Sequence, residues 1–175
     1  MPSISIRLAS VIFGASVLLA GAAHAQTAPA APETVPEELP FDIPYGPSIT
    51  VAHAQKVAMA AEAECRKHKW KMAITIVDPA GNLVYFWKMD GTQTASITIS
   101  EHKARVAATF RRPTKVFEDL IAKNNLYLTT LDGLIGSRGG VPLVENGKII
   151  GAIGVSGGAG SQDLTCAQAG ADTVK

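Results

Sequence analysis

The sequence lacks several features that would point directly to a function. Its 16 basic and 15 acidic side chains give a net charge of only +1, so it carries no electrostatic footprint for nucleic acid or for an anionic membrane. It has no GK[ST] ending of a phosphate-binding loop, no histidine pair at metalloprotease spacing and no recognisable Ser/His/Asp order. A function must therefore be sought in less familiar patterns.

No apolar run is long enough to span a membrane comfortably. The longest covers residues 8–20, whereas a spanning helix needs about 20 residues. Arg7 precedes this run, and Ala23 and Ala25 supply the small residues of a signal peptidase site. We predict a cleavable signal over residues 1–25, export to the periplasm or beyond, and no membrane anchor after cleavage. A retained anchor is the alternative.

The segment that follows the signal is rich in proline and alanine. Residues 26–47 hold most of the ten prolines, which fix φ and restrict the preceding residue. This composition predicts an extended tether whose more apolar end, residues 41–45, lies against the domain or a neighbouring subunit. One domain of ordinary size then covers residues 48–175.

Hydrophobic periodicity and turn residues predict an α+β domain with helices packed on an antiparallel sheet. The strongest local signal is Asn146-Gly147 between two apolar runs, which indicates a tight hairpin. The basic residues at 66–69 suit the negative end of the first helix. The expected elements are a helix at 49–69 capped by Ser48 or Thr50, strands at 72–77 and 83–89, a helix at 98–110 opened by a Thr98/Glu101 capping box, a helix at 114–123, at most one short strand within 128–135, strands at 141–145 and 148–155, and a helix at 162–171 capped by Ser161.

Two cysteines, Cys65 and Cys166, remain after signal cleavage. Export places them in an oxidising compartment, where a disulfide is the default pairing for two cysteines. One alternative is two buried thiols. Another is a metal bound by Cys65 and His68, although a structural zinc site needs four ligands.

The glycine-rich stretch 151–160 lies between an expected strand and an expected helix. Glycines there let backbone N–H groups approach an anion at the helix N-terminus. The spacing only loosely resembles a dinucleotide fingerprint, and no βαβ context surrounds it. We therefore favour a tight turn beside a pocket, with Gly157 and Gly158 as candidate ligand contacts.

Three cations are candidate anion receptors. Lys103 and Arg105 stand among small residues, where a basic side chain can receive a carboxylate. Arg138 lies between glycines in an expected loop. A solvated helix face and a surface loop explain the same residues equally simply.

Acid–base and metal-ligating residues are few. Glu101 and His102 are candidates for moving a proton if the protein is an enzyme. His53 and His102 are candidate axial ligands of a bound metal group, because imidazole is a common metal ligand. A structural role is the alternative for each histidine.

A set of motifs in chain order resembles one known family. These motifs are VDPAGNL at 77–83, MDG at 89–91, KAR at 103–105, RPT at 112–114, GGVPL at 139–143, GAIGVSG at 151–157 and QD at 162–163. Together they resemble the GlcG/HbpS family of haem-binding and haem-degrading proteins, which is related to the C-terminal domain of PduO-type cobalamin adenosyltransferases. The likeness covers residues 49–174.

The resemblance implies a profilin-like fold with about five strands in a central antiparallel sheet. It also implies a homo-oligomer with pockets near the subunit contacts, and haem or a related tetrapyrrole as a ligand to be bound or degraded. The sequence has no CxxCH, so haem would bind non-covalently, with Lys103, Arg105 or Arg138 meeting its propionates. The alternatives are a lyase-type enzyme acting on a small aromatic or hydroxy acid, and an accessory subunit of a periplasmic redox system.

Overall fold

A computed structural model describes residues 34–174, of which those from Glu38 onward belong to one compact unit. The predicted signal and residues 26–33 of the predicted tether lie outside the described residues. No helix in the described part of the chain is long and apolar enough to cross a membrane. The elements are α1 (Val51–Lys67), β1 (Ala73–Val77), β2 (Leu83–Lys88), α2 (Ser96–Thr109), α3 (Thr114–Ala122), the 3-10 helix η1 (Leu126–Thr130), β3 (Gly140–Glu145), β4 (Lys148–Ser156) and α4 (Gly160–Ala171).

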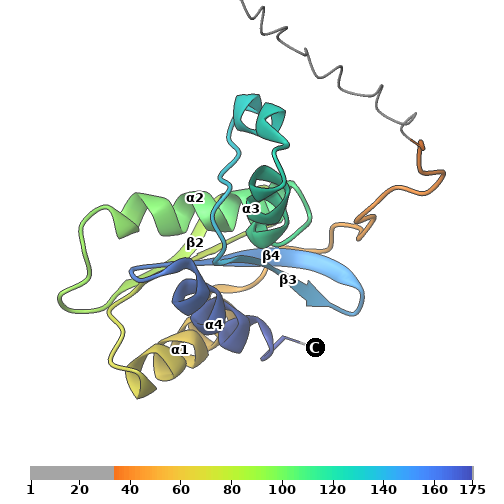
Figure 1. The fold of residues 1–175 in the computed structure, drawn as a ribbon. Coiled ribbons are helices and arrows are strands. Elements are labelled where there is room, and N and C mark those ends of the chain that lie inside the picture. Colours follow the sequence, from red (N-terminus) through yellow and green to blue (C-terminus); the bar gives the residue numbers. More distant parts are fainter. Residues whose placement is uncertain (1–33, 175) are drawn as a thin grey trace, which may run out of the picture. The chain divides into compact units, whose positions relative to one another are not determined.

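The strands form one antiparallel sheet in the order β2-β1-β4-β3. Helices α1 and α4 cover one face of this sheet, and α2 crosses the other (Figure 1). All five residues of β1 are buried, because this central strand is covered on both faces. The α+β architecture with an antiparallel sheet is therefore confirmed.

The number of strands is four among the described residues, not about five as predicted. No strand forms within 128–135, where at most one short strand was expected, and the chain forms η1 and further turns there. The N–H groups of Leu131 and Leu134 donate to carbonyl oxygens three residues earlier, at 3.3 and 3.2 Å. These local bonds satisfy the backbone that a sheet ladder would otherwise have used.

Local signals predicted some helix and strand ends correctly and others wrongly. Thr50 caps α1 by accepting the His53 N–H at 3.2 Å, and Asn146-Gly147 forms the β3–β4 turn with φ of 50° and 75°. Helix α2, however, begins at Ser96, so the Thr98/Glu101 capping box is wrong. The Thr98 hydroxyl instead donates to the Ala95 carbonyl oxygen at 3.2 Å.

Helix α4 begins at Gly160, which places Ser161 inside the helix and not at its cap. The capping contact comes from Gln162, whose side-chain oxygen accepts the Ala159 N–H at 2.8 Å. This satisfies one of the N–H groups left free where a helix begins.

Two long-range links join the first part of the chain to the rest. Tyr45 forms a parallel bridge with Ile149 of β4, beyond the end of β1, and the Ile149 N–H donates to the Pro44 carbonyl oxygen at 2.9 Å. The predicted disulfide is confirmed between Cys65 of α1 and Cys166 of α4, with the two Cα atoms 5.6 Å apart. It joins the two helices that share one face of the sheet.

Candidate functional site

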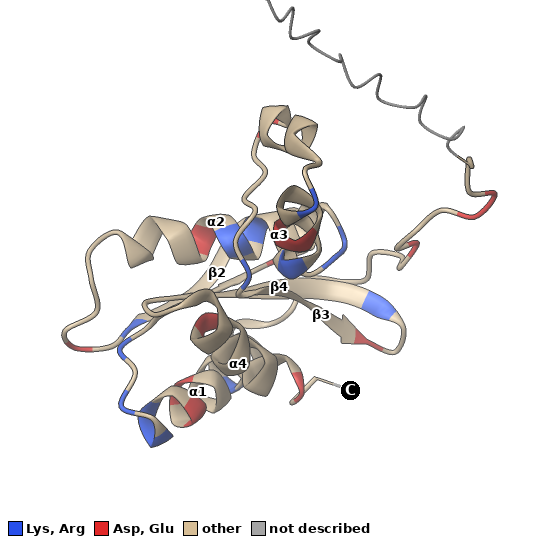
Figure 2. Ribbon diagram, in the orientation of Figure 1, with Lys and Arg blue, Asp and Glu red and all other residues tan. Residues whose placement is uncertain are grey.

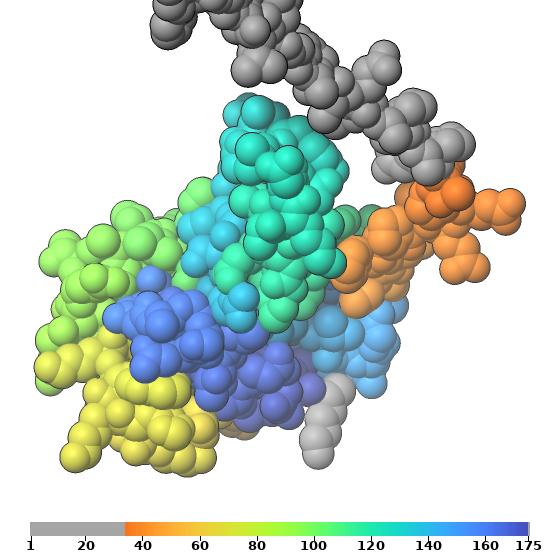
Figure 3. Space-filling view, in the orientation of Figure 1, coloured from red at the N-terminus to blue at the C-terminus, as the bar shows by residue number. Residues whose placement is uncertain are grey.

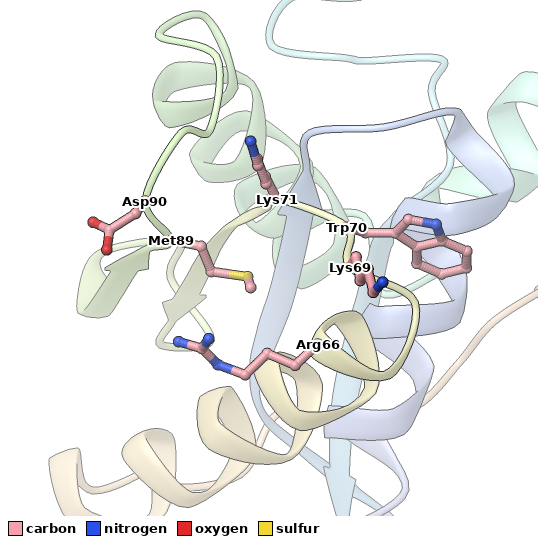
Figure 4. Close-up of a pocket in the computed structure, with 6 residues that line it drawn as sticks. All are labelled: Arg66, Lys69, Trp70, Lys71, Met89 and Asp90. Carbon is pink, nitrogen blue, oxygen red and sulfur yellow. The ribbon is translucent and has the colours of Figure 1, made fainter.

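Two adjoining hollows lie beside the short segment Lys69–Lys71, which connects α1 to β1. The first has a volume of about 270 Å³ and is completed by Arg66, Met89 and Asp90 (Figure 4). The second has a volume of about 290 Å³ and is completed by Met72, Gly91, Gln93, Gly157, Gly158 and Gln162. In Figure 3 the yellow end of α1, the green stretch after β2 and the blue turn before α4 meet in this region.

The end of α1 gives the segment its course. The Trp70 N–H donates to the Cys65 carbonyl oxygen at 3.0 Å, and the Lys69 N–H donates to Arg66 at 3.1 Å. These bonds close the helix in the manner of a Schellman motif, with Lys69 in the left-handed conformation at φ 59°. The chain then enters β1, and the Met89 N–H donates to the Met72 carbonyl oxygen at 3.0 Å. This bond joins the residue that follows β2 to the residue that precedes β1.

The glycine turn predicted beside a pocket does border the second hollow. A Cβ on Gly157 would lie 2.2 Å from the Lys71 carbonyl oxygen and 2.7 Å from the Met72 sulfur. Only a residue without a side chain lets the turn lie this close to the segment. The Gly158 N–H donates to Asp163 Oδ1 at 3.0 Å, which fixes the turn to the first part of α4.

The chemistry of the hollows is a mixture of apolar surface and positive charge. Trp70 and Met89 supply an aromatic and a thioether group, and the Trp70 ring stacks on His68 at 4.3 Å between centroids. Met72 borders the second hollow but is fully buried. Basic residues gather at the end of α1 and along the segment that follows it (Figure 2). Such a surface suits a ligand that has an apolar body and an acidic edge.

Lys103 does not border either hollow. Its side chain is 2% exposed, and its ammonium donates to Asp163 Oδ2 at 2.7 Å and to the Val155 carbonyl oxygen at 3.2 Å. Asp163 also accepts the Gly158 N–H. Lys103 therefore supports the glycine turn indirectly, through the carboxylate that the turn binds. A ligand carboxylate would have to displace Asp163 to reach it.

Glu101, His102 and Arg105 lie on more exposed parts of α2. Arg105 donates to Glu101 at 2.6 Å within one helical turn, and a His102 ring nitrogen lies 3.0 Å from the Gly133 carbonyl oxygen. None of the three borders the two hollows.

Arg138 forms an ion pair with Glu118 of α3. Its Nε donates to Glu118 Oε1 at 2.7 Å, and its backbone N–H donates to Oε2 of the same carboxylate. These hydrogen bonds hold the pKa of Glu118 below its ordinary value, although partial burial opposes them. The Arg138 guanidinium, which was predicted to bind a ligand anion, thus already binds a carboxylate of the protein.

The two histidines considered as axial ligands lie on opposite sides of the sheet. His53 opens α1, with Nδ1 3.8 Å from Glu145, whereas His102 belongs to α2. No group of three or more His, Cys, Asp or Glu residues in the described part of the chain is arranged to hold a metal ion. The sequence interpretation did not single out Trp70 and Lys71, and it attributed Lys69 to the helix dipole, although the run RKHKWK at 66–71 was a signal for these hollows.

Comparison with known proteins finds a family profile and curated relatives that match most of the domain. The family profile described as "Haem degrading protein HbpS-like" matches residues 49–172. Protein GlcG of Escherichia coli (strain K12) is 38% identical over 103 residues, which cover 59% of this chain and 77% of that protein.

Solved structures give the same relationship. A double mutant of HbpS from Streptomyces reticuli is 26% identical with a TM-score of 0.68, and the match covers 84% of this chain and 99% of that one. A complex of PduOC with haem is 22% identical with a TM-score of 0.66, and the match covers 73% and 96% of the two chains. This last likeness shows the fold alone.

Proposed function

Because the chain belongs to the family of HbpS-like haem-degrading proteins, we propose that it binds haem or a related tetrapyrrole at the two hollows. The observation that carries the proposal is that Trp70, which borders both hollows, and Met89, which borders the first, lie beside the cations of the 69–71 segment. A tetrapyrrole has an apolar ring and acidic propionates, so it needs both kinds of surface. We also propose that the α+β fold is of the profilin-like class that the family resemblance implies.

The residues at the hollows fit a haem group held without covalent attachment. One face of the Trp70 ring is stacked on His68, so the other face would meet the haem ring, and the thioether of Met89 is a group that can ligate haem iron. Met72 is fully buried and would support the site from within the core. When bound, haem supplies the redox chemistry of its iron. The chain's own part is to hold the ring edge and to keep the ring against apolar surface. His53 and His102 do not border the hollows, so the proposal assigns neither to the iron.

The size of the hollows favours binding between subunits. Pockets that bury most of a ligand have volumes of about 300–1,000 Å³, and each hollow lies just below that range. One chain would therefore cover one edge of a tetrapyrrole, and a second copy would cover more. This agrees with the homo-oligomer that the family resemblance implies.

Titration of haemin into the protein purified from residue 26 onward tests the proposal. We expect a shifted Soret band whose intensity saturates as micromolar haemin fills the sites formed by the two hollows. No Soret shift at micromolar haemin would overturn the proposal.

The modest volume of each hollow also favours a second candidate, an enzyme or receptor for a small carboxylic acid. In this case Asp90 is the acidic group among the described residues that border the first hollow. A screen of small aromatic and hydroxy acids by calorimetry tests it. Binding of an acid by protein that ignores haemin would favour this candidate.

We also propose that the protein is exported, because its disulfide suits an oxidising compartment. N-terminal sequencing of protein recovered from the periplasmic fraction tests this, and we expect the mature chain to begin at Gln26. Protein that keeps Met1 and stays in the cytosol would contradict it.

A further inference from the structure

We propose that Lys69 and Lys71 form a pair of carboxylate receptors that holds two acid groups on one edge of the ligand. The inference rests on the proposed function and deepens it by naming the ligand chemistry and the residues that read it. Three independent observations support it: the pairing of the neighbouring cations with glutamates, the left-handed backbone conformation of Lys69, and the contact of the Lys71 side chain with Gly91.

The first observation is that the cations just before the segment are already neutralised. Arg66 lies 2.6 Å from Glu62, and Lys67 lies 2.6 Å from Glu64, one turn back along α1. The hydrogen bond from Lys67 holds the pKa of Glu64 below its ordinary value. Among the residues that the structure describes, neither Lys69 nor Lys71 has a carboxylate or any other hydrogen-bond acceptor for its ammonium, so both are left for a ligand.

The second observation is the conformation of Lys69. It occupies the left-handed position after α1, where glycine is strongly preferred because a Cβ is disfavoured there. Non-glycine residues in this conformation are uncommon and carry backbone strain. In this chain the left-handed residue carries a cation that borders both hollows.

The third observation is the space given to Lys71. A Cβ on Gly91 would lie 3.0 Å from Lys71 Nζ and 3.1 Å from its Cδ, so the lysine side chain runs directly over this glycine. Any larger residue at position 91 would push the lysine aside. Gly157 in turn lies against the Lys71 backbone. The Lys71 side chain is exposed and lies along Gly91 on one side, so its ammonium is accessible to a ligand.

Two accessible ammonium groups that border the same hollows and point in different directions from the segment suit a ligand with two separated carboxylates (Figure 4). The propionates of a tetrapyrrole have this chemistry, and so does a small dicarboxylic acid. These two sources differ in the apolar body behind the acid groups, so the probes below separate them.

The experiment compares haemin with haemin dimethyl ester, in which both propionates are capped. We expect Lys69→Ala and Lys71→Ala each to weaken haemin binding roughly tenfold, as expected for the loss of one charged hydrogen bond, and to leave binding of the ester unchanged. Lys67→Ala is the matched control, because Lys67 is a neighbouring lysine that is paired with Glu64 and borders neither hollow. It should bind both probes as the wild type does.

Lys69→Gly adds a readout that a purely structural lysine would not give. Glycine relieves the left-handed strain, so the melting temperature should rise by roughly 3–5 °C while haemin affinity falls. A gain in stability without a loss of affinity would overturn the assignment of Lys69.

The outcomes separate this inference from the proposed function. If wild-type protein binds haemin and both alanine variants bind it equally well, the lysine pair is wrong and haem binding stands. If wild-type protein ignores haemin, haem binding is wrong, and succinate then tests the pair alone. Succinate binding that is lost in Lys71→Ala would support the pair, and succinate binding that is absent or unchanged would overturn it.

Discussion

At the scale of single residues, the buried ion pair of Lys103 and Asp163 has the largest expected effect on stability. Replacing Lys103 by Met leaves the Asp163 carboxylate buried without a cation. Breaking a buried pair in this way costs about 3–5 kcal/mol. We expect a loss of this size in the free energy of unfolding, measured by urea denaturation.

The double variant K103M/D163N provides the control. It removes both charges, and the amide oxygen introduced at position 163 can still accept the Gly158 N–H that Asp163 accepts at 3.0 Å. We expect it to recover most of the lost stability and to bind haemin like the wild type. A K103M protein as stable as the wild type would show that this pair does not hold the glycine turn.

Glu118 gives a pH dependence of stability with a definite sign. The hydrogen bonds from Arg138 lower the pKa of Glu118 from its ordinary value of 4.5, so this pair stabilises the fold above that pH. The contribution is lost as the pH falls through the lowered pKa. We expect the melting temperature of Glu118→Gln to fall less steeply than that of the wild type between about pH 5 and about pH 3.

Only part of the acid sensitivity should disappear in that variant. Glu64 keeps a lowered pKa through its bond with Lys67, and Asp78 keeps one through hydrogen bonds from its own turn that outweigh burial. Identical pH profiles for Glu118→Gln and wild type would contradict the stabilising role of the Arg138 pair.

At the scale of secondary-structure elements, the disulfide links α1 to α4 across 101 residues of chain. In the chain-entropy model, closing a loop of this length stabilises a fold by about 4–5 kcal/mol. We expect C65A/C166A to unfold at a much lower urea concentration than the wild type. The added reductant dithiothreitol should shift the wild-type midpoint toward that of the variant. Equal midpoints for the oxidised wild type and the variant would contradict the prediction.

The elements show where sequence patterns suffice. The first helix, the β3–β4 hairpin and the pairing of Cys65 with Cys166 were predictable because each depends on a strong local signal or on simple counting. The Thr98/Glu101 capping box failed because packing of Ser96 and Ser100 in the interior extends α2 toward its N-terminus. Residues 128–135 were left open between a short strand and no strand, because their local turns depend on backbone hydrogen bonds that no sequence pattern marks.

The candidate site was predictable only in part. The glycine turn was recognised, but the neighbouring cations were attributed to the dipole of α1, which explains Arg66 and Lys67 well. What distinguishes Lys69 and Lys71 is the absence of glutamate partners among the described residues, together with the glycines at 91 and 157. That distinction depends on contacts between residues far apart in the sequence, which no local pattern contains.

At the scale of the whole molecule, one surface carries an unusual amount of exposed apolar area. Val51 and Met59 of α1 are 61% and 57% exposed, and Leu83 and Trp87 of β2 are 55% and 41% exposed. A hollow of about 200 Å³ lies between Met59 and Trp87. Strand β2 is also an edge of the sheet, with backbone groups on its outer side that have no strand partner among the described residues. Large exposed apolar surfaces mark interaction sites, and an unpaired sheet edge can pair with another chain.

We therefore expect the α1–β2 surface to be a contact between copies of this protein. M59E/W87E should lower the mass measured by sedimentation velocity to that of a monomer, because burying two carboxylates in an apolar contact is strongly unfavourable. L126E/Y127E adds the same charges to exposed apolar residues of η1 and should keep the oligomer intact. If this second variant dissociates and the first does not, the contact lies at η1. A wild-type protein that is monomeric at micromolar concentration would remove the premise that a second copy completes the proposed haem site.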